Sequence, residues 1–447
     1  MYNSIIEKLN DKEIAILGFG LEGVSTYNFI RRHLPDKRLT IIDKCDIRNK
    51  VKDENVSIIF GDNYLSNLDK YDLIIKTPGI SLKDIDTSNI EDKITSQLEL
   101  VLEVFKNNTI GITGTKGKST TTTLIYNVLK DQGYDAYLLG NIGIPILDEV
   151  EKYNKNTYLV IEMSAHQLEY THVSPHIGLI LNLFEDHLDH AGTVFHYHMN
   201  KMNMFKYQNS DDYGIYCLDN DATVKYINEY KYKSKLYSIS NTKKASIYLN
   251  NDDVIYSGKV IYNKNNKRKL IGDHNLINIM FVYMVGIILD LDLNKINNTI
   301  ESFSPLEHRM ELVGEYNGIT YYNDSIATIP EATINALKAL KDTDTLIFGG
   351  MDRGIDYMPL IEYLKLSTVR NLICMPTTGY KVGKILEKDG IDKNYYYIES
   401  LEEAVKAASK ITQKGKIVLM SPAASSYEYF KNFIEKGNKY KEYIRNL

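Results

Sequence analysis

One segment, residues 111–120, constrains the fold of this chain more than any other; it reads Gly-Ile-Thr-Gly-Thr-Lys-Gly-Lys-Ser-Thr. It joins an apolar run typical of a strand, at 108–112, to a helical pattern at 121–130. Glycines at such a junction let the backbone approach phosphate oxygens closely, and the start of the helix offers unpaired N–H groups and a positive dipole end. The sequence therefore predicts a strand, a phosphate-binding loop and a helix within an α/β domain.

The side chains of this loop suit a triphosphate. Lys118 supplies a positive charge for the outer phosphates, and the hydroxyl of Ser119 or Thr120 can bind Mg²⁺. The spacing departs from the common Walker form, because Ile112 rather than glycine stands six positions before the lysine. A turn that binds nothing is the alternative, but such a turn has no use for Lys-Ser-Thr at a helix start. We predict an ATP-type site formed by Gly114, Thr115, Lys116, Gly117, Lys118, Ser119 and Thr120.

Composition narrows the class of protein. The 447 residues allow two to four domains, and 43% hydrophobic with 25% charged residues is ordinary for a globular chain. A net charge of -5 argues against a nucleic-acid partner, and three scattered cysteines argue against a disulfide framework or a metal motif. The most apolar helical segment, 279–289, is too short for a bilayer, which needs about 20 residues. We expect a cytoplasmic monomer with no membrane insertion and no cleavable leader.

Apolar runs that alternate with helical patterns predict an α/β fold of three domains. We expect a Rossmann-like N-terminal domain at 1–105, a P-loop-like central domain with added strands at 106–305, and a Rossmann-like C-terminal domain at 306–447. Asn317-Gly318 lies between two alternating runs and predicts a hairpin turn. The expected strands are 14–17, 39–42, 56–60, 72–75, 158–161, 177–181, 345–348, 372–375 and 416–420, with short strands between 213 and 269 and a long helix at about 274–291.

The first predicted domain carries a second glycine-rich loop, Gly18-Phe19-Gly20-Leu21-Glu22-Gly23, with Asp43 at the end of the next strand. Taken alone, this is the fingerprint of a dinucleotide site and supports an NAD-dependent dehydrogenase. Such a loop holds any pyrophosphate, including that of a UDP-sugar, and it can also be a tight turn that only packs a helix on a strand. The dehydrogenase hypothesis leaves the phosphate loop at 111–120 without a task.

Three more side chains follow strand ends near the phosphate loop. Glu162 directly follows the apolar run at 158–161, so it would lie at the carboxyl edge of the sheet, where a carboxylate can bind Mg²⁺. A glutamate that only faces solvent is an equally good interpretation of this position. His187 follows the next strand end, and Lys201, by default a solvated charge, lies on the helix after it. Seven of the ten histidines fall between 166 and 198, but their spacings do not form a zinc motif and we predict none.

The order of these motifs resembles the Mur ligases over nearly the whole chain. The set comprises Gly-Thr-x-Gly-Lys-Ser-Thr, the strand-end glutamate, Asn-x-x-x-Asp-His, Glu307-His308-Arg309, Asn323-Asp324-Ser325 and Ser421-Pro422-Ala423. The segment 349–353 and the ending, from 421–423 through 430–433, make the chain most similar to the members that add glutamate. The resemblance implies an ATP- and Mg²⁺-dependent amide ligase of peptidoglycan precursor synthesis. It would add glutamate, most commonly the D-isomer, to UDP-N-acetylmuramoyl-L-alanine through an acyl phosphate.

The resemblance also assigns roles by matching position. Lys118 would grip the outer phosphates, Ser119 and Glu162 would hold one Mg²⁺, and His187 would hold a second with Lys201, if this lysine is carbamylated. The matching residues for the base and ribose of ATP are Asn275, Asn278, Arg309 and Asp324. Those for the UDP-linked substrate are Gly18, Leu21, Glu22, Asp43, Gly79 and Asn141. Those for glutamate are Arg353, Ser426, Tyr427 and Phe433, with the arginine pairing a carboxylate at two points.

Three positions depart from the usual pattern of the glutamate-adding members. Lys116 stands where asparagine is usual, Ile326 where lysine is usual, and 424–427 reads Ala-Ser-Ser-Tyr rather than Cys-Ala-Ser-Leu. These departures are reminiscent of a variant that adds L-glutamate, whereas family frequency favours the D-isomer. A folate-type polyglutamate ligase, which lacks a UDP-holding first domain, and a non-catalytic nucleotide-binding module are further alternatives.

Overall fold

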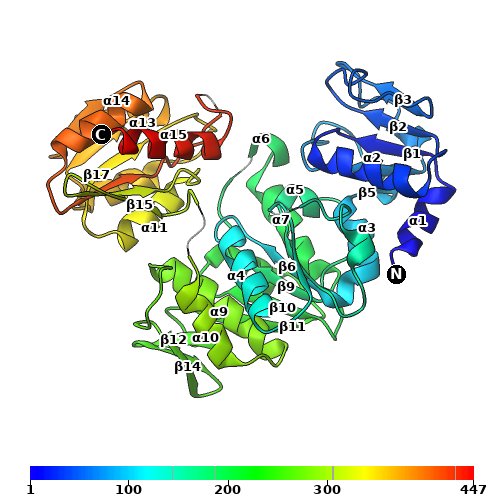
Figure 1. The fold of residues 1–447 in the computed structure, drawn as a ribbon, viewed down its shortest axis with the longest axis horizontal. Helices are drawn as coiled ribbons and strands as arrows, with labels where there is room; N and C mark the ends of the chain where they lie inside the picture. The colour runs from blue at the N-terminus through cyan, green and yellow to red at the C-terminus, as the bar shows by residue number, and fades with distance from the viewer. Residues whose placement is uncertain (143, 187, 305–306, 428) are drawn as a thin grey trace. The chain divides into compact units, whose positions relative to one another are not determined.

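The computed structural model describes residues 1–142, 144–186, 188–304, 307–427 and 429–447. Within these ranges the strands form three separate sheets of five, nine and six strands, and helices pack against them (Figure 1). The predicted fold class, three α/β parts with parallel or mixed sheets, is confirmed.

The first sheet is parallel throughout, in the order β3-β2-β1-β4-β5. Its central strand β1 (Ile14–Leu17) is buried at every position, as expected of a strand covered on both faces. Strand order reverses between β1 and β4, and sheets of this class bind ligands at that crevice. The other elements are α1 (Asn3–Asn10), α2 (Leu21–His33), β2 (Leu39–Ile42), β3 (Val56–Ile59), β4 (Leu73–Lys76), β5 (Ile94–Thr95) and α3 (Gln97–Phe105).

The middle sheet runs β14-β13-β12-β11-β10-β9-β6-β8-β7 and places β6 (Thr109–Thr113), the strand before the phosphate loop, between β9 and β8. Its pairings from β7 to β12 are parallel, and β13 and β14 extend it as an antiparallel ribbon. Its further strands are β7 (Ala136–Gly140), β8 (Tyr158–Glu162), β9 (Ile177–Ile180), β10 (Tyr213–Cys217), β11 (Lys235–Ser240), β12 (Ile247–Asn250), β13 (Asp253–Tyr256) and β14 (Lys259–Asn263). Its helices are α4 (Lys118–Asp131), α5 (Ala165–Leu168), α6 (Leu188–Ala191), α7 (Val194–Lys206), α8 (Asp221–Glu229), α9 (Asp273–Ile288) and α10 (Leu293–Ser302).

One helix interrupts the region predicted to contain only short strands. Residues 221–229 form α8, because the side chain of Asn220 accepts a hydrogen bond from the backbone N–H of Thr223 and caps the helix. The expected strands of this region are otherwise present as β10 to β14. The expected long helix at about 274–291 is α9, which ends three residues earlier.

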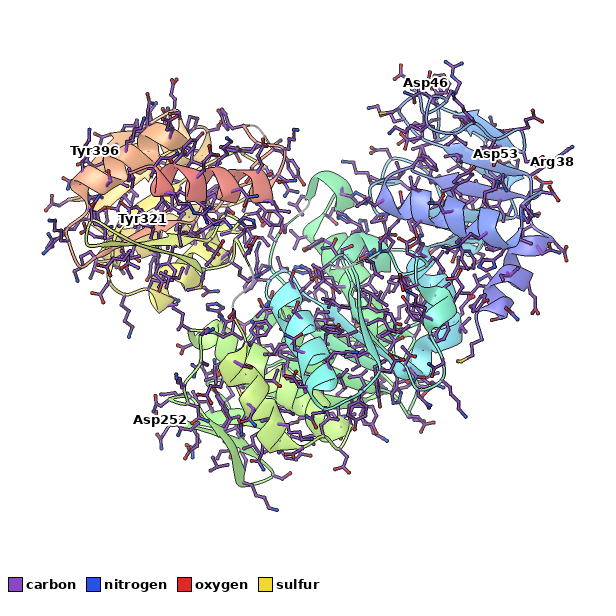
Figure 2. All side chains as sticks on the ribbon, in the orientation of Figure 1. Arg38, Asp46, Asp53, Asp252, Tyr321 and Tyr396 are labelled. Carbon is purple, nitrogen blue, oxygen red and sulfur yellow. The ribbon has the colours of Figure 1, made fainter. Side chains whose placement is uncertain are left out.

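The third sheet runs β15-β16-β20-β17-β18-β19, with β15 antiparallel to β16 and the other pairings parallel. The predicted hairpin turn is confirmed: Asn317 and Gly318 both adopt positive φ, 54° and 78°, between β15 and β16. Tyr321 on β16 is 1% exposed and lies in the core of the third sheet (Figure 2). Asp252, also labelled there, belongs to the middle sheet, in the turn between β12 and β13. The elements are β15 (Glu311–Tyr316), β16 (Ile319–Asn323), α11 (Pro330–Ala339), β17 (Thr343–Phe348), α12 (Met358–Leu366), β18 (Asn371–Cys374), α13 (Thr378–Lys388), β19 (Asn394–Tyr397), α14 (Leu401–Ile411), β20 (Ile417–Met420) and α15 (Phe433–Arg445).

Backbone contacts group the chain into two compact units. The first comprises 1–266 with 277–301, and the second comprises 267–276 with 302–447. The first and middle sheets fall in one unit because a single cluster of buried apolar side chains runs from Ile5 to Tyr226 through both. The predicted domain boundary at 305/306 lies outside the described residues, and the boundary at 105/106 stays a prediction. No helix of the described residues is long and apolar enough to cross a membrane.

Candidate functional site

The phosphate loop leaves β6 and enters α4 as the sequence predicts. Gly114 and Gly117 adopt φ values of 148° and 87°, which residues with a side chain rarely adopt. A Cβ atom at Gly117 would lie 2.7 Å from Oδ1 of Asn278, so this asparagine lies directly against the loop. Gly117 has no side chain to cap α4, and the first N–H groups of the helix therefore face the loop as an anion site requires.

A second segment, after β9, holds the loop in place. The side chain of Asn182 accepts a hydrogen bond from the N–H of Lys116 at 2.8 Å and donates one to the Lys116 carbonyl at 3.0 Å. The hydroxyl of Thr115 accepts from the N–H of Phe184 at 2.9 Å. Sequence reasoning noted Asn182 only as one letter of a motif and gave it no role. The structure shows that it fixes the conformation of the phosphate loop.

Two lysines converge on one carbonyl oxygen of the loop. Nζ of Lys118 lies 2.9 Å from the carbonyl oxygen of Gly114 and 3.1 Å from that of Thr115. Nζ of Lys201 also donates to the Gly114 carbonyl, at 2.9 Å, and lies 4.8 Å above the ring of Tyr197. Lys201 is 1% exposed, so the default expectation of a solvated charge on α7 is wrong.

Burial changes the chemistry of Lys201. It lowers the pKa of this amine well below 10.5, and the positive charge of Lys118 lowers the pKa further, against the opposing effect of Asp186 and Glu162. A lowered pKa leaves a larger fraction of the amine neutral at physiological pH, and a neutral amine is a nucleophile. The neutral fraction of the Lys201 amine is therefore larger than that of an exposed lysine, and carbamylation of Lys201 stays a prediction.

Glu162, the last residue of β8, is 1% exposed at the same sheet edge. Its Oε1 accepts a hydrogen bond from Nδ2 of Asn141 at 2.9 Å, whereas its Oε2 is buried with no hydrogen-bond partner among the described residues. Strand register pairs Glu162 with Ile112, two residues before Gly114 of the phosphate loop. Burial of a carboxylate oxygen without a hydrogen-bond partner destabilises the folded protein, because the oxygen loses its contacts with water. A bound cation such as Mg²⁺ would offset this loss.

Lys118, Glu162 and Lys201 therefore lie together, as the shared Gly114 carbonyl and their mutual electrostatic effects show. The predicted fourth member, His187, lies outside the described residues. No group of three histidine, cysteine or acidic side chains within the described ranges could hold a metal ion by itself. The donors present, a carboxylate and the buried hydroxyl of Ser119, suit Mg²⁺ that is also bound by phosphates and water.

The predicted UDP loops flank the crevice between β1 and β4. Gly18 adopts a φ of 93°, and a Cβ atom there would lie 2.1 Å from Oγ1 of Thr77, so only glycine fits. Asp43 holds this loop through its two oxygens, which accept hydrogen bonds from the N–H groups of Phe19 and Cys45, both at 2.8 Å. Leu21 is 85% exposed, and the space around Gly79 is open, as a substrate-facing loop requires. Glu22 is instead hydrogen-bonded within the protein, at 2.7 Å from Nε2 of Gln167.

The residues predicted for the base and ribose of ATP divide between the two units. Asn278 lies against the phosphate loop in the first unit. Asn275, one turn earlier on α9, belongs to the second unit and donates to the carbonyl of Ile271 at 2.8 Å. In that second unit Asp324 accepts from the hydroxyl of Ser421 at 2.7 Å and from the N–H of Met310 at 3.2 Å.

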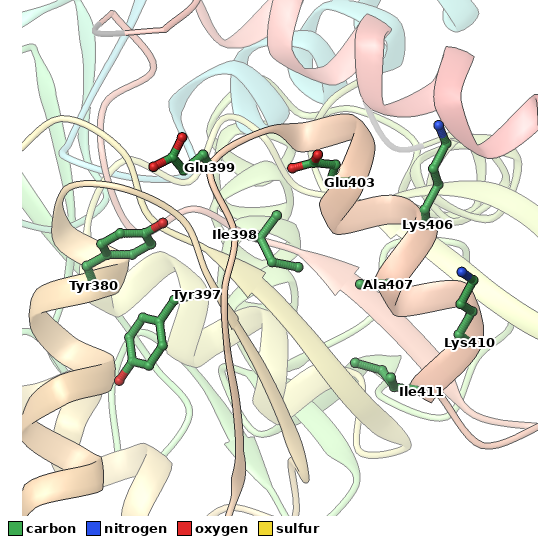
Figure 3. A pocket seen from close by; sticks show the side chains of 9 residues that line it. All are labelled: Tyr380, Tyr397, Ile398, Glu399, Glu403, Lys406, Ala407, Lys410 and Ile411. Atoms are coloured by element: carbon green, nitrogen blue, oxygen red, sulfur yellow. The ribbon is translucent and has the colours of Figure 1, made fainter.

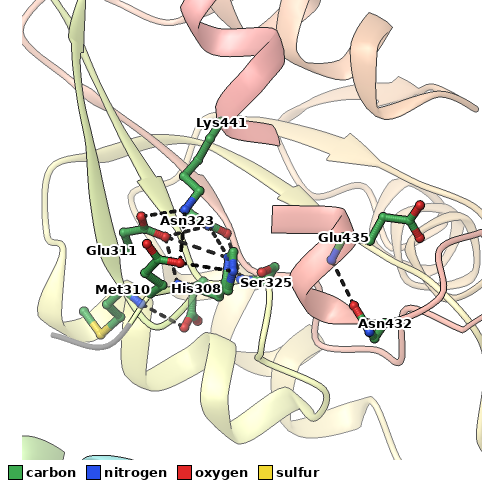
Figure 4. Close-up of polar contacts among 10 residues, drawn as sticks. His308, Met310, Glu311, Asn323, Ser325, Asn432, Glu435 and Lys441 are labelled. Carbon is green, nitrogen blue, oxygen red and sulfur yellow. Dashed lines mark hydrogen bonds and ion pairs between the residues drawn. The ribbon is translucent and has the colours of Figure 1, made fainter. Parts of the chain in front are cut away.

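Arg309 lies between two residues with positive φ, His308 at 66° and Met310 at 45°. Such backbone strain persists only where neighbours over-determine it, and here Glu311 does so. Glu311 accepts from the N–H of His308 at 2.8 Å and from Nδ2 of Asn323 at 2.9 Å, and its other oxygen lies 3.0 Å from Nζ of Lys441 on α15 (Figure 4). This network holds the backbone at His308, directly before Arg309.

The four residues predicted for glutamate lie on loops and a helix end of the second unit. Arg353 follows Gly349 and Gly350, whose φ values of 123° and 155° exclude other residues. Ser426 is 5% exposed and its Oγ has no hydrogen-bond partner among the described residues, so it can donate to a ligand. Tyr427 is 71% exposed, and Phe433 begins α15 with its ring 6.1 Å from that of His308.

Sequence reasoning missed Lys436, which is fully enclosed beside these loops. Its Nζ donates to the Gly349 carbonyl at 3.0 Å, and burial lowers the pKa of the amine to about 8. It lines a cavity of about 290 Å³ with Gly350 and Phe430. A lysine on a helix is expected to be exposed, and the residues around Lys436 in the sequence do not indicate that it is buried.

A larger hollow of about 710 Å³ lies elsewhere in the second unit, along β19 and α14 (Figure 3). Glu399, Glu403, Lys406 and Lys410 line it, so its charges are mixed, and none of the predicted site residues contributes. We assign no chemistry to this hollow, because it contains neither a phosphate loop nor a buried charged group.

Comparisons with known proteins agree with this geometry. Residues 112–286 match the family described as Mur ligase middle domain, and residues 308–424 match Mur ligase, glutamate ligase domain. A UDP-N-acetylmuramoylalanine–D-glutamate ligase of Clostridium kluyveri is 33% identical over 449 residues, which cover 98% of this chain and 97% of the relative. A protein of the same name from Acetivibrio thermocellus is 33% identical over 464 residues, which cover 100% and 98%.

Solved structures are similar in fold. The UDP-N-acetylmuramate–alanine ligase MurC of Thermotoga maritima is 19% identical with a TM-score of 0.59, over 97% of this chain and 99% of that one. The MurF ligase of Thermotoga maritima, solved with ADP, is 16% identical with a TM-score of 0.57, over 98% and 96%. At these identities the likeness shows a shared fold.

Proposed function

This chain belongs to the Mur ligase family, and we propose that it uses ATP to join D-glutamate to UDP-N-acetylmuramoyl-L-alanine in peptidoglycan precursor synthesis. The carrying observation is the cluster of Lys118, Glu162 and Lys201 around the phosphate loop. D-glutamate is the isomer named for the full-length relatives. Because ATP and the UDP-linked precursor are cytoplasmic metabolites, the protein would act in the cytoplasm.

The first half of the reaction activates a poor acyl donor. The alanyl carboxylate attacks the γ-phosphorus of ATP, the bond from that phosphorus to the β–γ bridging oxygen breaks, and ADP leaves as the acyl phosphate forms. Two anionic groups must therefore approach each other. Lys118 and the uncapped start of α4 offset this repulsion at the phosphates. Glu162, Ser119, His187 and carbamylated Lys201 would hold Mg²⁺, which supplies charge neutralisation at the reacting oxygens when bound. Asn141 keeps the Glu162 carboxylate oriented through its hydrogen bond.

The second half forms the amide. The neutral amine of glutamate attacks the acyl carbon, the C–O bond to the phosphate breaks, and phosphate leaves while the nitrogen releases a proton to solvent. Arg353 would pair with a glutamate carboxylate at two points, and the unpaired Ser426 hydroxyl would donate to one. Tyr427 and Phe433 would enclose the rest of the amino acid, which keeps water from the acyl phosphate.

We expect phosphate release that requires ATP, UDP-N-acetylmuramoyl-L-alanine and glutamate together, measured by a coupled phosphate assay with each substrate omitted in turn. The same samples, followed at the absorbance of a reduced nicotinamide and with folate in place of the UDP-sugar, test the dehydrogenase and folate-ligase alternatives. Phosphate release that persists without the UDP-sugar would count against the proposed function.

D-glutamate is expected to be the substrate, with L-glutamate used at least roughly 100-fold less efficiently, because a site that pairs both carboxylates of one isomer misplaces the amine of the other. The measurement is kcat/KM with each pure isomer. The L-adding variant is the alternative, favoured by Ile326 and by the Ala-Ser-Ser-Tyr sequence at 424–427. A preference for L-glutamate would replace the isomer and leave the ligase chemistry unchanged.

Glu162→Gln is expected to lower kcat by about 100-fold or more, because it removes the anionic oxygen that fits Mg²⁺ while the amide can still accept from Asn141. The Mg²⁺ concentration that gives half-maximal rate should rise at the same time. A Mg²⁺ titration of wild type and variant measures both effects. An unchanged Mg²⁺ requirement would remove Glu162 from the metal site.

A further inference from the structure

A cluster of charged and polar side chains joins the first and middle sheets. Apart from Glu22, which was predicted for the UDP-linked substrate, its members have no role in the proposed reaction. We call Glu22, Lys76, Gln167, Glu169 and His190 the junction cluster. On the first sheet, Glu22 follows the Gly18 loop, and Lys76 ends β4 directly before the loop that contains Gly79. On the middle sheet, Gln167 and Glu169 follow Glu162 within seven residues, and His190 lies three residues after His187.

Three contacts cross the junction. Nζ of Lys76 lies 3.0 Å from Oε2 of Glu169, with side chains 3% and 14% exposed, and Nε2 of His190 lies 3.6 Å from the same oxygen. Nε2 of Gln167 donates to Oε1 of Glu22 at 2.7 Å. The hydroxyl of Ser81, two residues after Gly79, donates to the backbone carbonyl of His190 at 2.9 Å. Each predicted UDP loop is thus tied to a segment that carries a predicted metal ligand.

Burial of these charged side chains shifts their pKa values. It lowers the pKa of Lys76 and raises that of Glu22, whereas Lys76 and His190 hold the pKa of Glu169 below its usual value despite burial. A buried ion pair adds little net stability compared with apolar side chains of the same size, but it specifies which groups must meet. Apolar contacts in the shared core would hold the two sheets together with less directional precision.

We propose that Lys76 and Glu169 are positioning residues that fix the distance between the UDP loops and the metal edge. A substrate held by its nucleotide at the first sheet would then present its alanyl carboxylate at Glu162 in a reactive position. This inference rests on the proposed function, because it concerns the path of that UDP-linked substrate. It predicts that breaking the pair harms the chemical step more than it harms nucleotide binding.

The test separates these two effects. For Lys76→Met we expect kcat to fall roughly 10- to 100-fold, because displacement of about 1 Å at a reacting centre has an effect of that order. The Kd of UDP, measured by calorimetry, and the KM of ATP should stay within about twofold of wild type, because the predicted UDP loops and the predicted phosphate loop for ATP each lie on one side of the junction. The exchanged pair Lys76→Glu with Glu169→Lys should recover a large part of kcat relative to Glu169→Lys alone.

The matched control is Lys106→Met. Nζ of Lys106 lies 2.7 Å from Oδ2 of buried Asp212, an ion pair of the same unit that is not at the junction. This variant should keep wild-type kcat. Thermal melting is recorded first for all variants, and if Lys76→Met does not fold, the nearly isosteric Glu169→Gln carries the same measurements.

Three results would overturn the proposal: kcat unchanged in folded Lys76→Met or Glu169→Gln, loss of UDP affinity in parallel with kcat, or an equal loss in Lys106→Met. Failure of the exchanged pair to exceed Glu169→Lys would also count against it. If the wild-type protein makes no product from ATP, D-glutamate and UDP-N-acetylmuramoyl-L-alanine, the proposed function fails. Normal wild-type turnover with an indifferent junction refutes only this inference.

Discussion

Lys201→Ala is expected to abolish turnover, with a loss of about 100-fold to 1000-fold or more in kcat, because it removes a group at the centre of the phosphate site. Lys201 is enclosed, lies 2.9 Å from the Gly114 carbonyl and shares that oxygen with Lys118. Burial lowers its pKa, and the proposed carbamylation would convert this amine into an anionic oxygen ligand for Mg²⁺. Phosphate release by the purified variant is the measurement.

Chemical rescue distinguishes a carboxylate-like role from a purely cationic one. Acetate or formate should partly restore Lys201→Ala, because a small carboxylate can enter the vacated space and supply the missing oxygens. Lys201→Arg should stay inactive, because it keeps the positive charge and cannot be carbamylated. Lys206→Ala, at the exposed end of the same helix, should behave as wild type. Full activity of Lys201→Ala without additives would exclude the role, and a folded variant that no carboxylate rescues would exclude carbamylation.

Lys118→Met is expected to reduce kcat by about 100-fold to 1000-fold, since methionine keeps much of the length of the side chain and removes the charge that offsets the phosphates. In the structure the Lys118 ammonium lies across the loop, on the carbonyls of Gly114 and Thr115. The loss of its charge should also raise the pKa of Lys201, because Lys118 is the largest electrostatic contribution that lowers it. Single-turnover phosphate release and the Kd of ATP, measured separately, report the two parts of the effect.

The control for this variant is Lys130→Met, which removes an exposed charge from the last turn of the same helix α4. It should keep wild-type kcat and ATP affinity. If Lys118→Met binds ATP and turns over normally, the phosphate loop does not serve the reaction and the proposed function has lost its main support.

Much of the fold follows from local pattern. The predicted strands at 14–17 and 39–42 coincide with β1 and β2, because short apolar runs between turn residues can only be buried strands in an alternating α/β chain. The hairpin at Asn317-Gly318 was predictable because its backbone conformation is available to few residue pairs. Helix α8 was not predicted, since its start depends on one side-chain hydrogen bond of Asn220.

The sites divide in the same way. The phosphate loop is one continuous segment. The sequence alone therefore predicts the features expected to bind phosphate, which are the glycines, the lysine and the start of the helix. Glu162 and Lys201 were not decided there, because a strand-end glutamate and a helical lysine are usually solvated. Their burial, and the convergence of Lys201 on Gly114 across 87 residues of chain, exist only once β6, β8 and α7 have packed. The junction pair of Lys76 and Glu169 likewise has no local signal.

The sequence by itself thus determined which segments can hold phosphate and where most strands and helices lie, because those properties depend on neighbouring residues. Only the tertiary structure decided which charges are buried together, because desolvation and electrostatic coupling depend on distances between segments that are far apart in the chain.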